Sequence, residues 1–196
     1  VEIIAKLICQ GNDILDGIKK IDKEIKGAYS ILILTKDGIY ATCGSSGHWP
    51  LVIGEKEGTI IISSESGGFN NLEYELIRDV EPGEIIFLKD GYRETKHKMP
   101  SENSRICSFL WVYTTFPNAV FRGIEASEVR NELGAALARR DIANGFVPDI
   151  VTAVPDSGRD HAIGYINEFI EQLEQGKIKK APRYSRALLK YPYSGR

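Results

Sequence analysis

Residues 155–159, Pro-Asp-Ser-Gly-Arg, bring together residue types that can hold an anion. They follow a short apolar run, 149–154, and precede a helical pattern. Pro155 cannot continue a central strand. In open α/β sheets, ligands bind where the carboxyl end of a strand leads into a helix. The position and composition of this turn therefore make it the first candidate binding site.

The chemistry that this turn predicts is phosphate or pyrophosphate binding. We expect Ser157 and Gly158 to leave backbone N–H groups free at the start of the helix, where the helix dipole also favours an anion. Arg159 adds a bidentate phosphate donor. Asp156 fits such a site if Mg²⁺ or a sugar hydroxyl is also bound. The alternative is that Asp156 or Ser157 only caps the helix.

The last twenty residues are strongly basic. From residue 177 onward there is no acidic residue, and three tyrosines are interleaved with the cations. Such a segment suits a polyphosphate ligand, and it would also suit nucleic acid. The alternative is a solvated tail. The seven basic residues are Lys177, Lys179, Lys180, Arg183, Arg186, Lys190 and Arg196.

Composition restricts the class of protein. The chain has 196 residues, 42% of them hydrophobic, and a net charge of −2. This is typical of a globular protein, and no apolar run is long enough to span a membrane. Three widely spaced cysteines indicate a reducing compartment, which we take to be the cytoplasm, and argue against a closed zinc site. The ends, at Val1 and Arg196, are interpreted as cuts in a longer protein.

The first half predicts an α+β domain. Apolar spacing indicates a helix over 3–8 and a second from about Asp13 to Gly27. A polar stretch, 93–104, reads as a linker, which places a domain boundary near 98–104. Between the helices and the linker we expect mostly antiparallel strands, with Asp-Gly hairpin turns at 37–38 and 90–91 and a helical turn near 69–77.

The second half predicts an α/β domain with a parallel sheet, because helical and strand patterns alternate. A helix over 127–145 should bury the face carrying Val129, Leu133, Ala136 and Leu137. A buried-type strand follows over 149–154. A helix over 166–176 should turn Ile166, Phe169, Ile170 and Leu173 inward.

Several blocks in order resemble a known family. "KGAYSILILTKDGIYA", "PLVIG", "ISSES" and "YELIRDVEPGEIIFLKDG" are similar to the second half of a class II glutamine amidotransferase domain. "CSFLWVYTTFPNAVFRGIEASEVRNELGAALA", "PDIVTAVPDSGRDHAIGY" and "LLKYPYSGR" resemble the portion that follows it in the amidophosphoribosyltransferases. These enzymes make phosphoribosylamine from glutamine and phosphoribosyl pyrophosphate (PRPP) in purine synthesis.

The resemblance implies an architecture. Residues 1–98 correspond to the C-terminal half of the amidotransferase domain, a partial Ntn-type αββα sandwich. Residues 104–196 correspond to the N-terminal part of a type I phosphoribosyltransferase domain, a Rossmann-like parallel sheet. It also implies a pentosyltransferase that acts on PRPP and glutamine and forms a homo-oligomer in its full-length form. Composition adds that no membrane partner is expected, and the near-neutral whole chain makes nucleic-acid binding the least favoured hypothesis.

The resemblance also implies site residues. Asp156, Ser157, Gly158 and Arg159 match the pyrophosphate loop, which binds PRPP with Mg²⁺. The flexible loop of the family is matched by Lys190, Tyr191, Gly195 and Arg196. Cys107 matches one ligand of the [4Fe–4S] cluster that some members carry.

The departures from the family are equally specific. The family's N-terminal cysteine nucleophile and its pair of adjacent acids for PRPP are missing, so no catalytic residue is assigned and the 196 residues by themselves are expected to be inactive. Leu110 replaces a usual glutamate. The competing hypotheses are a non-catalytic paralogue that binds PRPP or a nucleotide, and another class II amidotransferase.

Overall fold

The computed structural model describes residues 1–101 and 104–191. The chain divides into two compact units, Val1–Cys107 and the part from Ser108 onward. This division falls slightly beyond the boundary that the polar stretch indicated. No helix in the described part of the chain is both long and apolar enough to cross a membrane.

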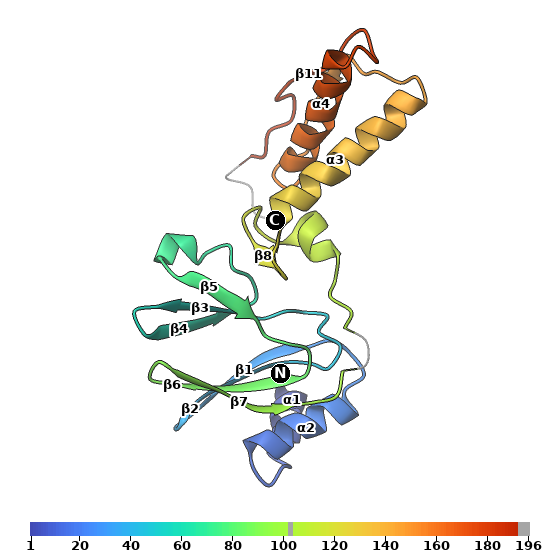
Figure 1. Cartoon of the computed structure of the whole chain (residues 1–196). Coiled ribbons are helices and arrows are strands. Elements are labelled where there is room, and N and C mark those ends of the chain that lie inside the picture. Colours follow the sequence, from blue (N-terminus) through green and yellow to red (C-terminus); the bar gives the residue numbers. More distant parts are fainter. Residues whose placement is uncertain (102–103, 192–196) are drawn as a thin grey trace. The chain divides into compact units, whose positions relative to one another are not determined.

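The first unit stacks a helical layer and two antiparallel sheets (Figure 1). The helices are α1 (Glu2–Ile8) and α2 (Ile14–Glu24), and Asp13 caps α2 by accepting from the Asp16 N–H. One sheet has the order β1-β2-β6-β7 and the other β4-β3-β5. The strands are β1 (Ser30–Thr35), β2 (Gly38–Cys43), β3 (Val52–Lys56), β4 (Thr59–Ser63), β5 (Glu75–Asp79), β6 (Glu84–Lys89) and β7 (Tyr92–Lys98), with a 3-10 turn at Asn70–Leu72.

Strand β6 packs against a different layer on each of its two faces. Successive side chains of a strand point to opposite faces. Ile85 accordingly packs with Ile18 of α2, whereas Ile86 packs with Ala41 and Ile53 between the two sheets. These side chains are almost completely buried. The order helix, sheet, sheet agrees with the expected α+β sandwich.

The prediction of a linker over 93–104 was wrong for its first half. Residues 92–98 form β7, which pairs along its length with β6. The stretch is polar because β7 is the edge of its sheet, where charged side chains are tolerated and main-chain pairing supplies the stability. The helical turn expected over 69–77 is similarly short, since β5 begins at Glu75.

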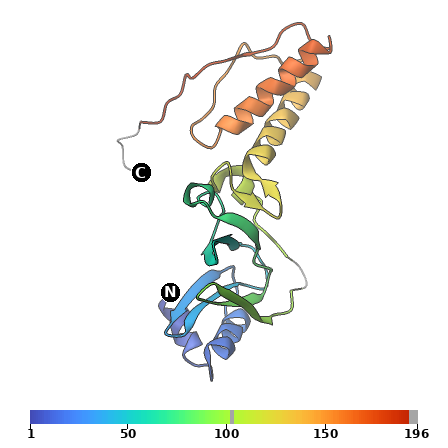
Figure 2. The same ribbon diagram turned by 60° about the vertical axis from the view of Figure 1, so that its left-hand side comes forward.

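The second unit is built on two helices that lie side by side in both views (Figures 1 and 2). They are α3 (Ala126–Ala143) and α4 (Arg159–Glu174). The shorter elements are a π-helix, η2 (Leu110–Thr114), and the strands β8 (Val120–Phe121), β9 (Ile124–Glu125), β10 (Ile150–Val151) and β11 (Arg183–Tyr184). Strands β10 and β11 pair in parallel with α4 between them, as an α/β unit requires.

The predicted buried face of α3 was wrong. Leu133 and Leu137 are each 42% exposed, and the buried positions are instead Ala126, Arg130, Gly134 and Ala138. The reason is the close approach of α4. A Cβ at Gly134 would overlap the His161 carbonyl oxygen, and one at Gly164 would overlap the Asn131 carbonyl oxygen. Small residues therefore face the neighbouring helix, and the leucines point away.

Two further burial predictions fail in part. Phe169 of α4 is fully buried as expected, but Ile170 and Leu173 are exposed. The strand over 149–154 shortens to two residues, and Val154 at its end is 67% exposed. An apolar run of strand length does not by itself reveal which residues pair.

Candidate functional site

The candidate site is centred on the turn at residues 155–159, which leads from β10 into α4. Gly158 is the N-cap of α4, and no side chain of residues 1–101 or 104–191 caps the helix. The capping alternative for Asp156 and Ser157 is therefore not what the structure shows. The Gly158 N–H donates to the Val154 carbonyl at 3.0 Å, so the expectation that it is free was wrong. The peptide bond between Pro155 and Asp156 is cis.

The turn nevertheless presents open donors. The N–H groups of Ser157, Asp160 and His161 have no hydrogen-bond partner among the residues that the structure describes. They lie at the positive end of the α4 dipole, where backbone N–H groups bind anions. The His161 imidazole Nδ1 contacts the Ser157 carbonyl at 3.2 Å, which occupies this ring nitrogen within the turn.

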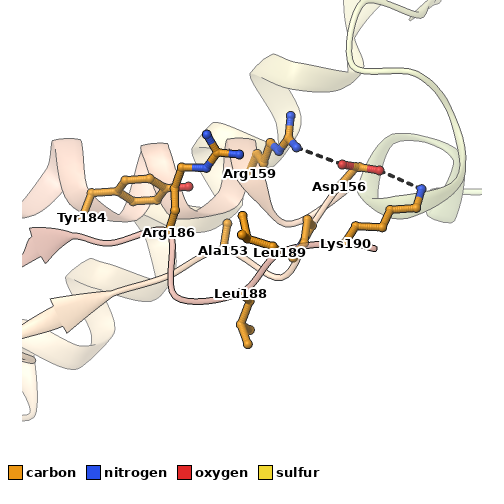
Figure 3. A pocket seen from close by; sticks show the side chains of 9 residues that line it. Ala153, Asp156, Arg159, Tyr184, Arg186, Leu188, Leu189 and Lys190 are labelled. Carbon is orange, nitrogen blue, oxygen red and sulfur yellow. Dashed lines mark hydrogen bonds and ion pairs between the residues drawn. The ribbon is translucent and has the colours of Figure 1, made fainter. Parts of the chain in front are cut away.

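Two cations flank the turn (Figure 3). The Asp156 carboxylate accepts from the Arg159 guanidinium at 3.0 Å and from the Lys190 ammonium at 2.9 Å. All three side chains are about half exposed. Solvent screens such pairs, so they contribute little to stability and remain available to a stronger ligand.

Two cavities adjoin this ion pair. One of about 380 Å³ is lined by Arg159, Tyr184, Arg186 and Lys190, with Leu188 and Leu189 as its apolar part (Figure 3). The other, of about 800 Å³, lies between the turn and residues 113–117. Arg130 also lines the larger cavity. Both have the size of sites for small molecules.

The basic segment reaches the turn because β11 pairs with β10. Lys190 and Tyr191, two of the predicted flexible-loop residues, lie in the segment that follows β11. Lys190 contacts Asp156, whereas Tyr191 is 67% exposed. Gly195 and Arg196, the other two, lie outside the described residues. Lys180 pairs with Asp149 at 2.8 Å, and this lowers the pKa of the Asp149 carboxyl.

The described residues do not form a metal site by themselves. No group of three or more His, Cys, Asp or Glu side chains gathers in residues 1–101 and 104–191. A [4Fe–4S] cluster requires cysteine thiolates in proximity, and Cys107, Cys9 and Cys43 do not provide it. For Mg²⁺ the turn offers one carboxylate, Asp156. Because Mg²⁺ at phosphate sites is held by one or two carboxylates together with substrate phosphates, this donor set fits only a metal that arrives with its ligand.

Comparison with known proteins gives the turn its context. A curated amidophosphoribosyltransferase from Archaeoglobus fulgidus is 32% identical over 178 residues, 91% of this chain. One from Methanocaldococcus jannaschii is 33% identical over 197 residues. The chain belongs to the amidophosphoribosyltransferase family. It spans about two fifths of the length of these relatives, 38% and 41%.

Solved structures agree with this family assignment. The glutamine PRPP amidotransferase of Bacillus subtilis, solved with ADP and GMP, matches the whole chain with a TM-score of 0.85 and 31% identity, over 40% of its own length. A structure described as the allosteric regulatory enzyme of purine biosynthesis matches with a TM-score of 0.84 and 30% identity. No sequence profile of a known family matches the chain.

Two features of this candidate site were missed from sequence. One is the pairing of Asp156 with Lys190, which are distant in the chain and meet only through the β10–β11 pair. The other is Arg130, a charged side chain that is 1% exposed beside the larger cavity. Its signal was available in the spacing, since Arg130 is in phase with Ala126, Gly134 and Ala138 on the small-residue face of α3.

Proposed function

We propose that this chain supplies the pyrophosphate-binding turn of an enzyme that transfers the amide nitrogen of glutamine to PRPP. The observation that carries the proposal is the turn at 155–159. Open N–H donors at the start of α4 and the guanidinium of Arg159 converge there, beside Lys190. Such a set stabilises the diphosphate that leaves when an amine attacks C1 of the ribose.

The roles of the individual residues follow from this geometry. Asp156 occupies the two cations when no ligand is present, and the diphosphate replaces its carboxylate as their partner. Ser157 contributes its backbone N–H. Gly158 allows the tight turn, because a Cβ added there would lie 2.6 Å from the Val154 carbonyl oxygen. The segment with Lys190 and Tyr191 covers the ligand on the other side. Catalysis by such a site is positional and electrostatic, since the protein forms no covalent bond to the diphosphate.

The first unit contributes part of the glutaminase half in this proposal. Its helix-sheet-sheet stack provides the scaffold on which the remaining three fifths of the relatives' length would complete the glutamine site. The substrates glutamine and PRPP, Mg²⁺ as the companion of PRPP, and assembly as a homo-oligomer in the cytoplasm belong to this same proposal.

The test is diphosphate binding by the turn. Isothermal titration of the 196-residue chain with inorganic pyrophosphate at low salt should show binding, and Arg159→Met should weaken it about tenfold, because a charge-assisted donor is lost. Arg140→Met is the matched control. Arg140 lies on α3, is 70% exposed, and contacts Asp141 at 3.7 Å. Absence of binding, or equal affinity in Arg159→Met, would contradict the proposal.

The same variant separates the enzyme from a binding paralogue. In a protein that also carries the remaining length of the relatives, Arg159→Met should impair PRPP consumption and spare glutamine hydrolysis measured without PRPP. A protein that binds pyrophosphate but shows neither activity would be the non-catalytic alternative.

A further inference from the structure

A buried arginine connects the two sides of the larger cavity. Arg130 of α3 is 1% exposed. Its Nε donates to the Trp111 carbonyl at 2.7 Å, and one terminal nitrogen donates to the Thr115 carbonyl at 2.8 Å. Trp111 is the second residue of the short π-helix η2 and Thr115 is its C-cap, so the guanidinium can satisfy carbonyl oxygens that a helix of this length leaves unpaired. Arg130 thus fixes the segment 110–117, which we call the aromatic wall.

The same guanidinium faces α4. Its second terminal nitrogen lies 3.9 Å from the Asp160 carboxylate, in the first turn of α4, and Asp160 is 19% exposed. A buried charge is costly unless it is paired and hydrogen-bonded. Here two carbonyls and one carboxylate compensate it. The carbonyls belong to the aromatic wall, and the carboxylate belongs to the first turn of α4, directly after residues 155–159, which we call the anion turn. The position of one therefore depends on the position of the other.

The rest of the wall is anchored on the α3 side. The Trp111 indole N–H donates to the Ile124 carbonyl at 3.0 Å, and its ring stacks edge-on against Phe121 with centroids 5.7 Å apart. The Ser127 N–H donates to the Pro117 carbonyl at 2.8 Å. The Trp111 end of the wall is thus attached to β8 and β9, and the Pro117 end to the start of α3. Arg130 adds the link from the wall to α4.

We propose that Arg130 is a positioning residue, which holds the aromatic wall in register with the anion turn and transmits occupation of the turn to the wall. The inference rests on the proposed function, because it assumes that diphosphate binds at residues 155–159. An anion on the Ser157, Asp160 and His161 N–H groups orders the first turn of α4. Asp160 sits in that turn, so the guanidinium and the Trp111 and Thr115 carbonyls adjust with it.

Trp111 allows this coupling to be measured. The sequence has two tryptophans, and Trp49 lies in the first unit. A Trp49→Phe background leaves Trp111 as the only indole. Titration of that protein with inorganic pyrophosphate, followed by fluorescence and by calorimetry, reports the wall and the affinity separately. We expect a saturable change in Trp111 emission at the calorimetric midpoint.

Two substitutions at Arg130 then test geometry against charge. Arg130→Met removes both the planar set of guanidinium donors and the positive charge. Arg130→Lys keeps the charge, but one compact ammonium cannot serve two carbonyls and a carboxylate together. We expect Arg130→Met to bind pyrophosphate about tenfold more weakly, as for loss of charge-assisted bonds. The Trp111 response should be lost in both variants and kept in the control Arg140→Met.

The outcomes are decisive in either direction. A wild-type Trp111 response in Arg130→Lys or Arg130→Met would overturn the proposal, and so would pyrophosphate binding without any change in Trp111 emission. If circular dichroism shows that the Arg130 variants do not fold, Asp160→Asn decides, because it should reduce the Trp111 response while leaving the guanidinium in place. An unchanged response there would overturn the inference. Failure of pyrophosphate to bind at all would refute the proposed function instead.

Discussion

The Lys190 ammonium lies 2.9 Å from the Asp156 carboxylate, although Asp156 precedes α4 in the chain and Lys190 follows it. Arg159 contacts the other oxygen of the same carboxylate at 3.0 Å. An acid on the turn thus pairs with both cations that a diphosphate would need. A protein carboxylate that stands where a ligand anion is expected competes with that ligand.

Asp156→Asn should therefore tighten the binding of metal-free pyrophosphate. Each exposed pair is worth at most about 1 kcal/mol, so the gain should be about two- to fivefold. The measurement is titration calorimetry with a chelator present. Asp149→Asn is the control, since Asp149 forms a similar exposed pair with Lys180 at 2.8 Å, outside the lining of both cavities. Weaker binding in Asp156→Asn would show that the carboxylate contacts the ligand itself.

Gly164→Ala should destabilise the second unit. The new methyl group would overlap the Asn131 carbonyl oxygen, so α3 and α4 would have to separate. Overpacking of this kind costs about 1–3 kcal/mol. Thermal unfolding followed by circular dichroism gives the value. Gly68→Ala, at an exposed position with nothing within 4 Å of the added Cβ, should leave the midpoint unchanged. Equal midpoints for both variants would contradict the close helix contact.

Glu84→Gln should lower stability in the first unit and change its pH dependence. Burial alone would raise the pKa of the Glu84 carboxyl, but bonds from Arg78, Thr95 and the Glu81 N–H outweigh it and hold this pKa below the usual 4.5. A carboxyl with a lowered folded pKa stabilises above its unfolded pKa, and this contribution is lost as pH falls through the folded value.

The expected loss in Glu84→Gln is about 1–3 kcal/mol near neutral pH, because a buried charged acceptor is removed. The difference from wild type should shrink below pH 4.5, the ordinary glutamate value. Urea unfolding at a series of pH values measures both effects. Glu73→Gln is the control, since Glu73 pairs with Lys56 but is 79% exposed. A loss that did not diminish in acid would mean that the Glu84 charge is not its source.

Local chemistry made the hairpins predictable from sequence. Asp90 and Gly91 both adopt positive φ angles, 45° and 77°, as a two-residue turn between paired strands requires. The cap at Asp13 and the start of α2 could be predicted for the same reason. These features depend on neighbouring residues, which a sequence displays directly. The anion turn was also visible, because its residue types are unusual after an apolar run.

Tertiary contacts account for what the sequence did not reveal. The apolar residues of α3 suggested a leucine face, but backbone contact at Gly134 and Gly164 decides which side is buried. Burial of Arg130 depends on carbonyls of η2, a different element. The polar character of 93–98 indicated a linker because edge strands and linkers share composition. Each incorrect prediction concerns a residue whose environment is set by contact with another element of the fold.

The parallel pairing of β10 with β11 also bears on where the chain tolerates insertions. Asp156 follows Val151 by five residues and Lys190 follows Tyr184 by six, and Val151 and Tyr184 are register partners. The segments 152–156 and 185–190, which carry Asp156 and Lys190, therefore both start from the same pair of residues in the β10–β11 sheet. We call these segments the two arms of the site. An insertion between α4 and β11 would leave both arms intact, because the pairing restores the register after it. An insertion between Tyr184 and Lys190 would carry the ammonium away from the turn, so length variation among homologues should concentrate before β11.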